Sequence, residues 1–117
     1  MKIIIGSCHC GKVSFELATT LESSLKCTCS YCLRRATTMH RLDASQFALL
    51  SGETMLGEYG SQHSIKHYFC KNCGINCFTR VNRPMNHSVL VNVGCLEGIE
   101  NYSLTPTILD EAVLEAE

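Results

Sequence analysis

The chain carries Cys8-His9-Cys10-Gly11, Cys27-Thr28-Cys29-Ser30-Tyr31-Cys32 and Cys70-Lys71-Asn72-Cys73-Gly74, and these three short stretches decide its fold. They hold seven of the nine cysteines in 117 residues. Thiolates one to three positions apart on a tight turn can converge on a single metal ion with little bending of the backbone. The spacing therefore predicts metal binding by these cysteines.

A disulfide framework is the other common explanation for so many cysteines in a small protein. Here the count of nine is odd, and the cysteines are clustered instead of spread along the chain. The opening Met1-Lys2-Ile3-Ile4-Ile5-Gly6 is also too short for the apolar core of a signal peptide. We therefore expect reduced cysteines and a cytoplasmic location.

Composition narrows the class of protein further. Apolar residues make up 45% of the chain, the formal net charge is -1, and only ten residues are lysine or arginine. A nucleic-acid-binding module is normally distinctly basic, and no apolar run approaches the roughly 18 residues that a membrane span requires. We expect one globular domain over residues 1–117, with no nucleic-acid partner and no membrane partner.

Alternating polar and apolar residues predict a mainly β protein in which helix is scarce. Half-buried strands are expected over residues 12–17, 64–69 and 88–93, and a turn or loop over residues 82–86. Single helical turns are expected over residues 30–35 and 44–47, and helix-forming residues recur over 109–117.

Two of the cysteine clusters share a local pattern. In residues 10–15 and 73–78 alike, Cys-Gly is followed by a phenylalanine five positions after the cysteine. A glycine after the last ligand permits a positive φ, which lets backbone amides turn toward the thiolates. Two such knuckles facing each other predict a four-thiolate centre of zinc-ribbon type, made by Cys8, Cys10, Cys70 and Cys73.

The number of cysteines in each cluster supports this pairing. The clusters hold two, three and two cysteines, so intact clusters give four plus three ligands only if the outer two combine. Cys27, Cys29 and Cys32 are then left for a second centre, which one loop can hold in a solvent-accessible position. Four protein ligands make a closed, structural zinc site, and three leave the open position of a catalytic zinc. Zinc suits thiolates better than Mg²⁺ or Ca²⁺ does, although iron also fits a four-thiolate site.

The second centre has another interpretation. Its three cysteines can hold a second structural ion if His9, His40 or an unassigned cysteine supplies the fourth ligand. The two cysteines outside the clusters, Cys77 and Cys95, are expected to be small buried apolar residues.

The ligand set of the second centre also indicates a class of reaction. Three anionic sulfurs leave a zinc ion a weaker Lewis acid than three histidines would, so activating water is not its best use. A thiol that binds to the ion is deprotonated and becomes a nucleophile at neutral pH. The expected reaction is the addition of a thiol to a small electrophile, or its release.

Four stretches in register carry a family resemblance: GSCHCGKVSF over 6–15, CTCSYCLRR over 27–35, FCKNCG over 69–74 and VNVGCL over 91–96. With them the chain resembles the glutathione-dependent formaldehyde-activating enzyme family, which also contains centromere protein V. The resemblance implies a β-tent fold of antiparallel sheets with two zinc ions per chain. The structural ion would lie at the outer clusters and the catalytic ion at the middle one.

The same resemblance implies a carbon-sulfur lyase activity that combines glutathione and formaldehyde reversibly into S-(hydroxymethyl)glutathione. The glutathione sulfur would take the open position on the second zinc and attack formaldehyde. Arg34 and Arg35 are the expected partners of the glutathione carboxylates, because arginine binds a carboxylate through two parallel hydrogen bonds. His40, His63 and His67 are candidates for moving protons near neutral pH, although each also fits an ordinary surface or strand histidine.

A non-catalytic protein is the alternative. A zinc-stabilised binding module with two structural metal sites would act through an exposed surface, such as the acidic tail of Glu111, Glu115 and Glu117. A thiol or metal sensor is a third possibility. These classes differ in whether the second centre keeps an exchangeable position.

Overall fold

The computed structural model of the chain describes residues 2–60, 64–99 and 104–109. Within these ranges the chain is mainly β, with one α-helix and three short 3₁₀ helices, as the sequence predicts. The strands are β1 Lys2–Ser7, β2 Ser14–Thr19, β3 Leu25–Cys27, β4 Met39–Asp43, β5 Phe47–Ser51, β6 Leu56–Gly60, β7 Ile65–Cys70, β8 Asn76–Arg83, β9 Asn86–Asn92 and β10 Thr107–Leu109. The helices are α1 Ser30–Arg35, η1 Ala44–Gln46, η2 Glu53–Met55 and η3 Val93–Cys95.

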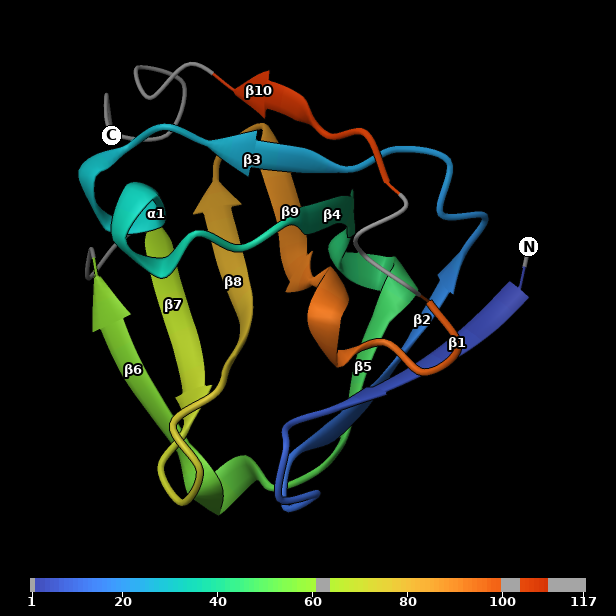
Figure 1. Cartoon of the computed structure of the whole chain (residues 1–117), viewed down its shortest axis with the longest axis vertical. Helices are drawn as coiled ribbons and strands as arrows, with labels where there is room; N and C mark the ends of the chain where they lie inside the picture. The colour runs from blue at the N-terminus through green and yellow to red at the C-terminus, as the bar shows by residue number, and fades with distance from the viewer. Residues whose placement is uncertain (1, 61–63, 100–103, 110–117) are drawn as a thin grey trace.

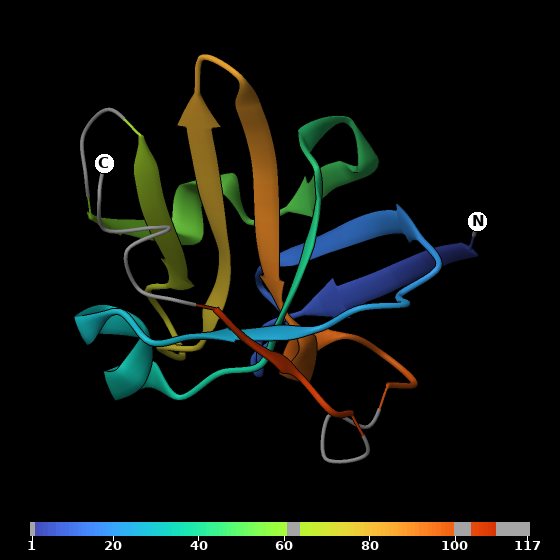
Figure 2. The same ribbon diagram turned by 90° about the horizontal axis from the view of Figure 1, so that it is seen from above.

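The strands form two sheets (Figure 1). A three-stranded sheet has the order β1-β2-β5, and a seven-stranded sheet has the order β10-β3-β4-β9-β8-β7-β6. Neighbouring strands are antiparallel except β10 and β3, which run in parallel in Figure 1 and overlap in the view of Figure 2. The other strand pairs are antiparallel, as the resemblance implies.

The main core lies between the two sheets. Strand β2 alternates half-buried and buried residues, and its Phe15 and Leu17 are fully buried. The Phe15 ring packs against Phe47 of β5 and Phe78 of β8, with ring centroids 5.5 and 5.9 Å apart. Burying such rings stabilises the fold by roughly 1.5–3 kcal/mol each. Contacts between β2, β5 and β8 therefore fix the small sheet against the large one.

Most elements lie close to where the sequence places them. The expected strands at 12–17, 64–69 and 88–93 correspond to β2, β7 and β9, each shifted by one or two residues. The helical turn expected over 30–35 is α1, and that expected over 44–47 is η1. Among the described residues, no helix is both long enough and apolar enough to span a membrane.

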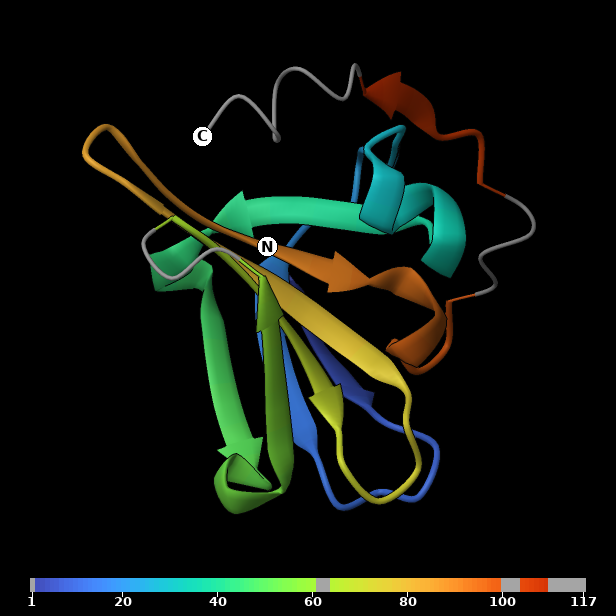
Figure 3. The same ribbon diagram turned by 90° about the vertical axis from the view of Figure 1, so that its left-hand side faces the viewer.

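Two expected segments in the second half of the chain, at residues 82–86 and 109–117, differ from the structure or lie partly outside the described residues. The turn or loop expected over residues 82–86 is shorter in the structure, because β8 continues to Arg83 and β9 starts at Asn86. Only Pro84 and Met85 remain as the turn of a hairpin that projects from the molecule (Figure 3). Leu109 ends β10 instead of starting a helix. The rest of the expected helix, with Glu111, Glu115 and Glu117, lies outside the described residues, as does His63.

Gly52 packs against the residues that follow the first cysteine cluster, and replacing it should lower the free energy of unfolding. It has a φ of +92°, and a Cβ added there would collide with the carbonyl oxygen of Lys12 and the backbone of Val13. Gly98 has a similar φ of +75° but no described atom within 4 Å of an added Cβ. We expect Gly98→Ala to lower the free energy of unfolding by about 1–2 kcal/mol, the cost of the left-handed conformation. Gly52→Ala should cost about 1–3 kcal/mol more, because overpacking adds to that strain.

Urea denaturation of the two variants beside the wild type measures the difference. Equal destabilisation by both substitutions would show that the contact with the Lys12 carbonyl does not constrain Gly52.

Candidate metal centres

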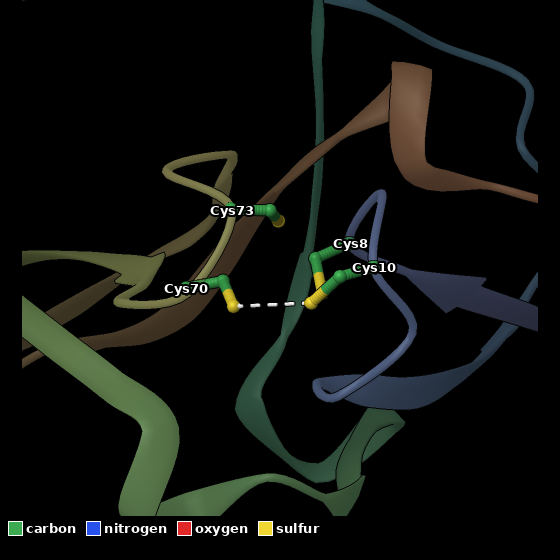
Figure 4. A group of neighbouring side chains, drawn as sticks. All are labelled: Cys8, Cys10, Cys70 and Cys73. Carbon is green, nitrogen blue, oxygen red and sulfur yellow. Dashed lines mark hydrogen bonds between the residues drawn. The ribbon is translucent and has the colours of Figure 1, made fainter.

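The first cysteine group joins two loops that are far apart in the sequence. Cys8 and Cys10 follow β1, Cys70 ends β7 and Cys73 follows it, and the four side chains point toward one another (Figure 4). All four sulfurs lie within 4.8 Å of one another, with 3.6 Å between Cys8 and Cys10 and 3.7 Å between Cys10 and Cys70. Tetrahedral zinc with bonds of about 2.3 Å requires sulfurs about 3.8 Å apart. The four residues that the sequence groups together thus have the geometry to hold a zinc ion.

The two loops share one backbone conformation. Gly11 and Gly74 have φ of +82° and +80°, as the knuckle pattern predicts. In the first loop the Cys8 amide donates to the Val13 carbonyl at 3.0 Å, and the Val13 amide donates to the Cys8 sulfur at 3.4 Å. The Cys70 amide donates to the Ile75 carbonyl in the same way at 3.0 Å. The repeat arises because glycine alone adopts this turn without strain.

Backbone donors prepare the first group for a cation. The Ile75 amide donates to the Cys73 sulfur and lowers the pKa of that thiol to about 6. A side-chain hydrogen bond from Asn72 and a backbone hydrogen bond from Lys12 lower the pKa of Cys10. Burial acts the other way on Cys8 and raises its pKa to about 11. The metal-binding thiolate form is therefore favoured more at Cys73 and Cys10 than at the buried Cys8.

The second cysteine group is built around the start of α1. Cys27 ends β3, Cys29 is the N-cap of α1, and Cys32 lies in its first turn. The Cys29 amide donates to the Cys27 sulfur at 3.4 Å, and the Cys32 amide donates to the Cys29 sulfur at 3.3 Å. These bonds hold the three sulfurs within 4.8 Å of one another. A helix N-terminus also has unpaired amides that favour negative charge, so thiolates are stabilised there.

The burial of the two groups differs from the expectation. Cys27, Cys29 and Cys32 are only 4 to 5% exposed, so the second group is not the solvent-accessible loop that its short span suggests. They pack in a separate cluster with apolar residues of β4, β7, β8 and β9: Met39, Ile65, Val81 and Leu90. Burial raises the pKa of Cys32 to about 12, and the positive charge of Arg35 opposes that rise. The sulfurs of the second group are therefore largely shielded from solvent, whereas Cys10 of the first group is exposed.

No fourth ligand for the second group is found in the part of the chain that the structure describes. His40 uses both ring nitrogens elsewhere, with Thr19 Oγ1 at 2.8 Å and the Ser23 carbonyl at 2.6 Å. His9 is exposed beside Cys8 and does not join the group. Cys77 and Cys95 are 0% and 8% exposed, which confirms that they are buried. The described residues thus leave three sulfurs without a fourth protein ligand.

The structure separates the two arginines that follow Cys32. Consecutive residues of a helix point about 100° apart. Arg34 is exposed and donates to the Ser30 carbonyl at 2.8 Å. Arg35 instead turns to the second group and donates to the Cys32 sulfur at 3.3 Å. Of the two residues expected to bind substrate carboxylates, Arg34 is therefore exposed, and Arg35 is half-buried with its guanidinium turned to the second group.

A group of polar and aromatic side chains surrounds Arg35. The Tyr31 ring stacks on the His67 imidazole with centroids 4.0 Å apart, and His67 Nδ1 lies 2.8 Å from Thr79 Oγ1. Asn76 donates to the Tyr31 hydroxyl at 3.1 Å. Tyr31, Asn76 and Thr79 were not identified from the sequence as site residues. Tyr31 lies inside the cysteine cluster, but nothing in the local pattern distinguishes Thr79, which comes to the site only through strand pairing.

His67 should make the stability of the protein depend on pH. Burial, followed by the charge of Arg35, lowers the pKa of His67 from 6.5 to about 4. Between these values the unfolded chain binds a proton that the folded chain does not, so the free energy of unfolding decreases as the pH falls from about 6.5 to about 4. Each unit of the shift corresponds to roughly 1.4 kcal/mol.

Urea denaturation at pH 6.5 and pH 5, with zinc in excess, tests this dependence. We expect the wild type to lose about 2 kcal/mol more than His67→Gln over this interval. The glutamine variant is the control for proton binding by the cysteines, because both chains contain the same cysteines and that contribution cancels in the comparison. The same loss in both chains would contradict a neutral, buried His67.

A cavity of 620 Å³ opens beside the C-terminal end of α1. Its lining includes Ala36 and Thr38 from the segment after α1, Asn92 from β9, the cation Lys26, and His9. Lys26 directly precedes Cys27, and His9 lies between two ligands of the first group. The cavity has the size of a small-molecule site and a positive charge suited to an anionic ligand.

Comparison with known proteins fits this geometry. A model of the family described as "Glutathione-dependent formaldehyde-activating enzyme" matches residues 3–111, a range that contains both cysteine groups. The chain belongs to this family. A crystal structure of a Rhodobacter sphaeroides protein is similar at 31% identity, covering 89% of this chain and 97% of that chain, with a TM-score of 0.77.

Membership in the glutathione-dependent formaldehyde-activating enzyme family agrees with the resemblance drawn from the four sequence stretches. The family's description names a thiol and an aldehyde, and the three sulfurs near α1 are a ligand set that suits thiol binding. The family and the two cysteine groups together support a metal-dependent enzyme of this general type.

Proposed function

We propose that the chain catalyses the reversible addition of glutathione, or a similar thiol, to formaldehyde or another small aldehyde. The observation that carries this proposal is the difference between the two cysteine groups. The second group has three sulfurs and no fourth protein ligand among the described residues, whereas the first group has four sulfurs. Three protein ligands are typical of catalytic zinc, and four are typical of structural zinc. We therefore assign the structural ion to Cys8, Cys10, Cys70 and Cys73, and the catalytic ion to Cys27, Cys29 and Cys32.

The reaction forms one carbon–sulfur bond and moves one proton. The thiol sulfur adds to the carbonyl carbon, the carbonyl π electrons move to oxygen, and the proton lost by the thiol ends on that oxygen. A zinc ion at the second group supplies the deprotonated, positioned thiol when it is bound. The reverse step releases the aldehyde and the thiol, so no oxidant or reductant is needed.

The residues around the second group have separate tasks in this proposal. Cys27, Cys29 and Cys32 hold the ion in an apolar surrounding that excludes water. Arg34 reaches solvent and is the candidate partner for a glutathione carboxylate. The cavity that carries Lys26 has room for the rest of the tripeptide. His67 Nε2 has no hydrogen-bond partner among the described residues, so a proton carried there is available to donate a hydrogen bond to the carbonyl oxygen.

Zinc content and exchange kinetics test the proposal. We expect two zinc ions per chain, and NMR exchange spectroscopy should show glutathione and formaldehyde interconverting with S-(hydroxymethyl)glutathione faster than in buffer. A buffer sample with the same zinc concentration controls for the free ion. Exchange at the buffer rate with two ions bound would overturn the assignment of formaldehyde chemistry.

One observation favours a second candidate function. The 4 to 5% exposure of Cys27, Cys29 and Cys32 is also suited to a second structural ion in a non-catalytic binding module. That candidate predicts two ions that resist exchange with added thiols and no acceleration of adduct formation. Spectra of the Co²⁺-loaded chain separate the two, because a thiol that enters the second group changes the sulfur-to-metal absorption bands.

A further inference from the structure

We propose that Arg35 is a positioning residue that fixes the second cysteine group to strand β8, instead of binding substrate. The inference rests on the proposed function only in taking Cys27, Cys29 and Cys32 as a metal centre. It concerns how this chain holds that centre in place, and it gives the two adjacent arginines different roles.

The guanidinium of Arg35 makes contacts on two sides. Nη2 donates to the Cys32 sulfur at 3.3 Å and lies 2.8 Å from the Met39 sulfur. Nη1 donates to Asn76 Oδ1 at 2.8 Å and to Thr79 Oγ1 at 3.2 Å. A guanidinium is rigid, planar and always charged, so it can bridge two elements that a flexible ammonium cannot hold together. Arg35 thus connects the first turn of α1 to the first half of β8.

An aromatic ring restrains this bridge further. The Arg35 guanidinium carbon lies 5.1 Å from the centroid of Tyr31, which itself stacks on His67. A cation over an aromatic ring gains about 0.5–2 kcal/mol, depending on how far water is excluded. The Arg35 side chain is therefore held in one orientation before any substrate arrives.

The charge of Arg35 is matched to the centre it contacts. Three thiolates and one Zn²⁺ carry a formal charge of -1, and burying an unpaired charge is costly. Among the described residues no carboxylate pairs with Arg35, so its positive charge acts on the sulfurs. A hydrogen bond to a charged sulfur is also stronger than one between neutral groups. Arg35 therefore favours retention of the metal by compensating the charge of its ligands.

The other end of the bridge determines the form of His67. Thr79 Oγ1 accepts a hydrogen bond from Arg35, since arginine cannot accept one. Thr79 is buried, and His67 Nδ1 is the other described polar atom within 2.8 Å of its hydroxyl. Donation of the Thr79 proton to Nδ1 satisfies that hydroxyl, and the neutral imidazole then carries its own proton on Nε2. Arg35 thereby links retention of the metal to the tautomer of the histidine proposed to donate a hydrogen bond to the carbonyl oxygen.

Competition titration of the zinc-loaded protein with a chelator tests the bridge. We expect Arg35→Ala to lower the zinc affinity of the second group by about 10- to 100-fold, the usual effect of removing such an outer partner of a metal ligand. Arg35→Lys should lose about as much, because one ammonium cannot contact Cys32 and Thr79 together. Arg34→Ala, one position earlier, is the matched control and should keep wild-type affinity. Cys29→Ser identifies which of the two ions belongs to the second group.

A ¹⁵N NMR measurement of the His67 ring gives a second readout, which a merely structural role would leave unchanged. We expect the Nε2–H tautomer in the wild type and in Arg34→Ala, and a mixture of tautomers in both Arg35 variants. Wild-type zinc affinity in Arg35→Ala, or full rescue of affinity by Arg35→Lys, would overturn the bridge. Wild-type His67 tautomers in the Arg35 variants would overturn the link to His67.

This test and the test of the proposed function fail separately. A wild type that binds two zinc ions without catalysing exchange would contradict the function and leave the role of Arg35 intact. An active enzyme whose Arg35→Ala variant retains zinc normally would contradict the role of Arg35 alone. A chain that binds zinc only at the first group would overturn both.

Discussion

Replacing Cys29 with serine should abolish catalysed exchange between glutathione and formaldehyde while the chain stays folded. Cys29 is both a predicted metal ligand and the N-cap of α1, where its sulfur accepts a hydrogen bond from the Cys32 amide at 3.3 Å. Serine is among the best N-cap residues, so its hydroxyl can take over that hydrogen bond. The substitution therefore removes a thiolate ligand without removing the cap.

The expected result is a fall in exchange to the rate measured in buffer and a decrease from two zinc ions to one per chain. Cys29→Ala is the matched control, because it removes the ligand and the cap together. The alanine variant should be about 1 kcal/mol less stable than the serine variant, with the same loss of activity. If Cys29→Ser kept both the second ion and its exchange rate, Cys27, Cys29 and Cys32 would not be the catalytic ligands.

Replacing Cys70 with serine should unfold most of the chain. Cys70 is fully buried, and its sulfur lies 3.7 Å from Cys10 on a loop 60 positions away. Binding of a structural zinc ion contributes about 10–16 kcal/mol in small zinc domains. That value matches or exceeds the net stability of about 5–15 kcal/mol that is typical of whole domains. Loss of the ion should therefore leave β1 and β7 without their cross-link and the two sheets only weakly joined.

Circular dichroism and the dispersion of amide resonances measure this loss directly. Cys77→Ala provides the matched control, since Cys77 is also 0% exposed and packs in the same core but lies outside both cysteine groups. It should cost only about 1 kcal/mol, as small core truncations commonly do. Similar unfolding by Cys70→Ser and Cys29→Ser would contradict the division into one structural and one functional centre.

Local patterns account for what the sequence predicted well. The Cys-Gly knuckles were predictable because a positive φ after the ligand requires glycine, and both Gly11 and Gly74 adopt it. The short helix after Cys29 and the alternation in β2 depend on neighbouring residues in the same way. Strand β9 does not keep the half-buried character expected over residues 88–93, because four consecutive residues, Ser88 to Val91, are buried on both of its faces. Grouping the cysteines needed only their spacing and number, which is why both groups were found without any knowledge of the sheets.

Features that depend on strand pairing were not predictable. Whether Cys27, Cys29 and Cys32 are exposed is decided by Ile65, Val81 and Leu90, which reach them from three other strands. Arg34 and Arg35 are adjacent in sequence and point in different directions from α1, and the position of β8 relative to α1 decides which partners Arg35 meets. The pairing of β7 with β8 likewise places Thr79 opposite His67. A single sequence contains no short-range signal for such contacts.

Strand β8 connects the two cysteine groups. Its first residue, Asn76, follows Ile75, whose carbonyl accepts the amide of Cys70 in the first group. The side chain of Asn76 contacts Arg35 and Tyr31 at the second group, and its carbonyl accepts Asn92 at 2.7 Å. We therefore expect metal loading to be ordered, with the first ion needed to place the contacts that retain the second. Under zinc limitation, chains would then lose activity while they are still folded, and chains holding only the second ion would be absent.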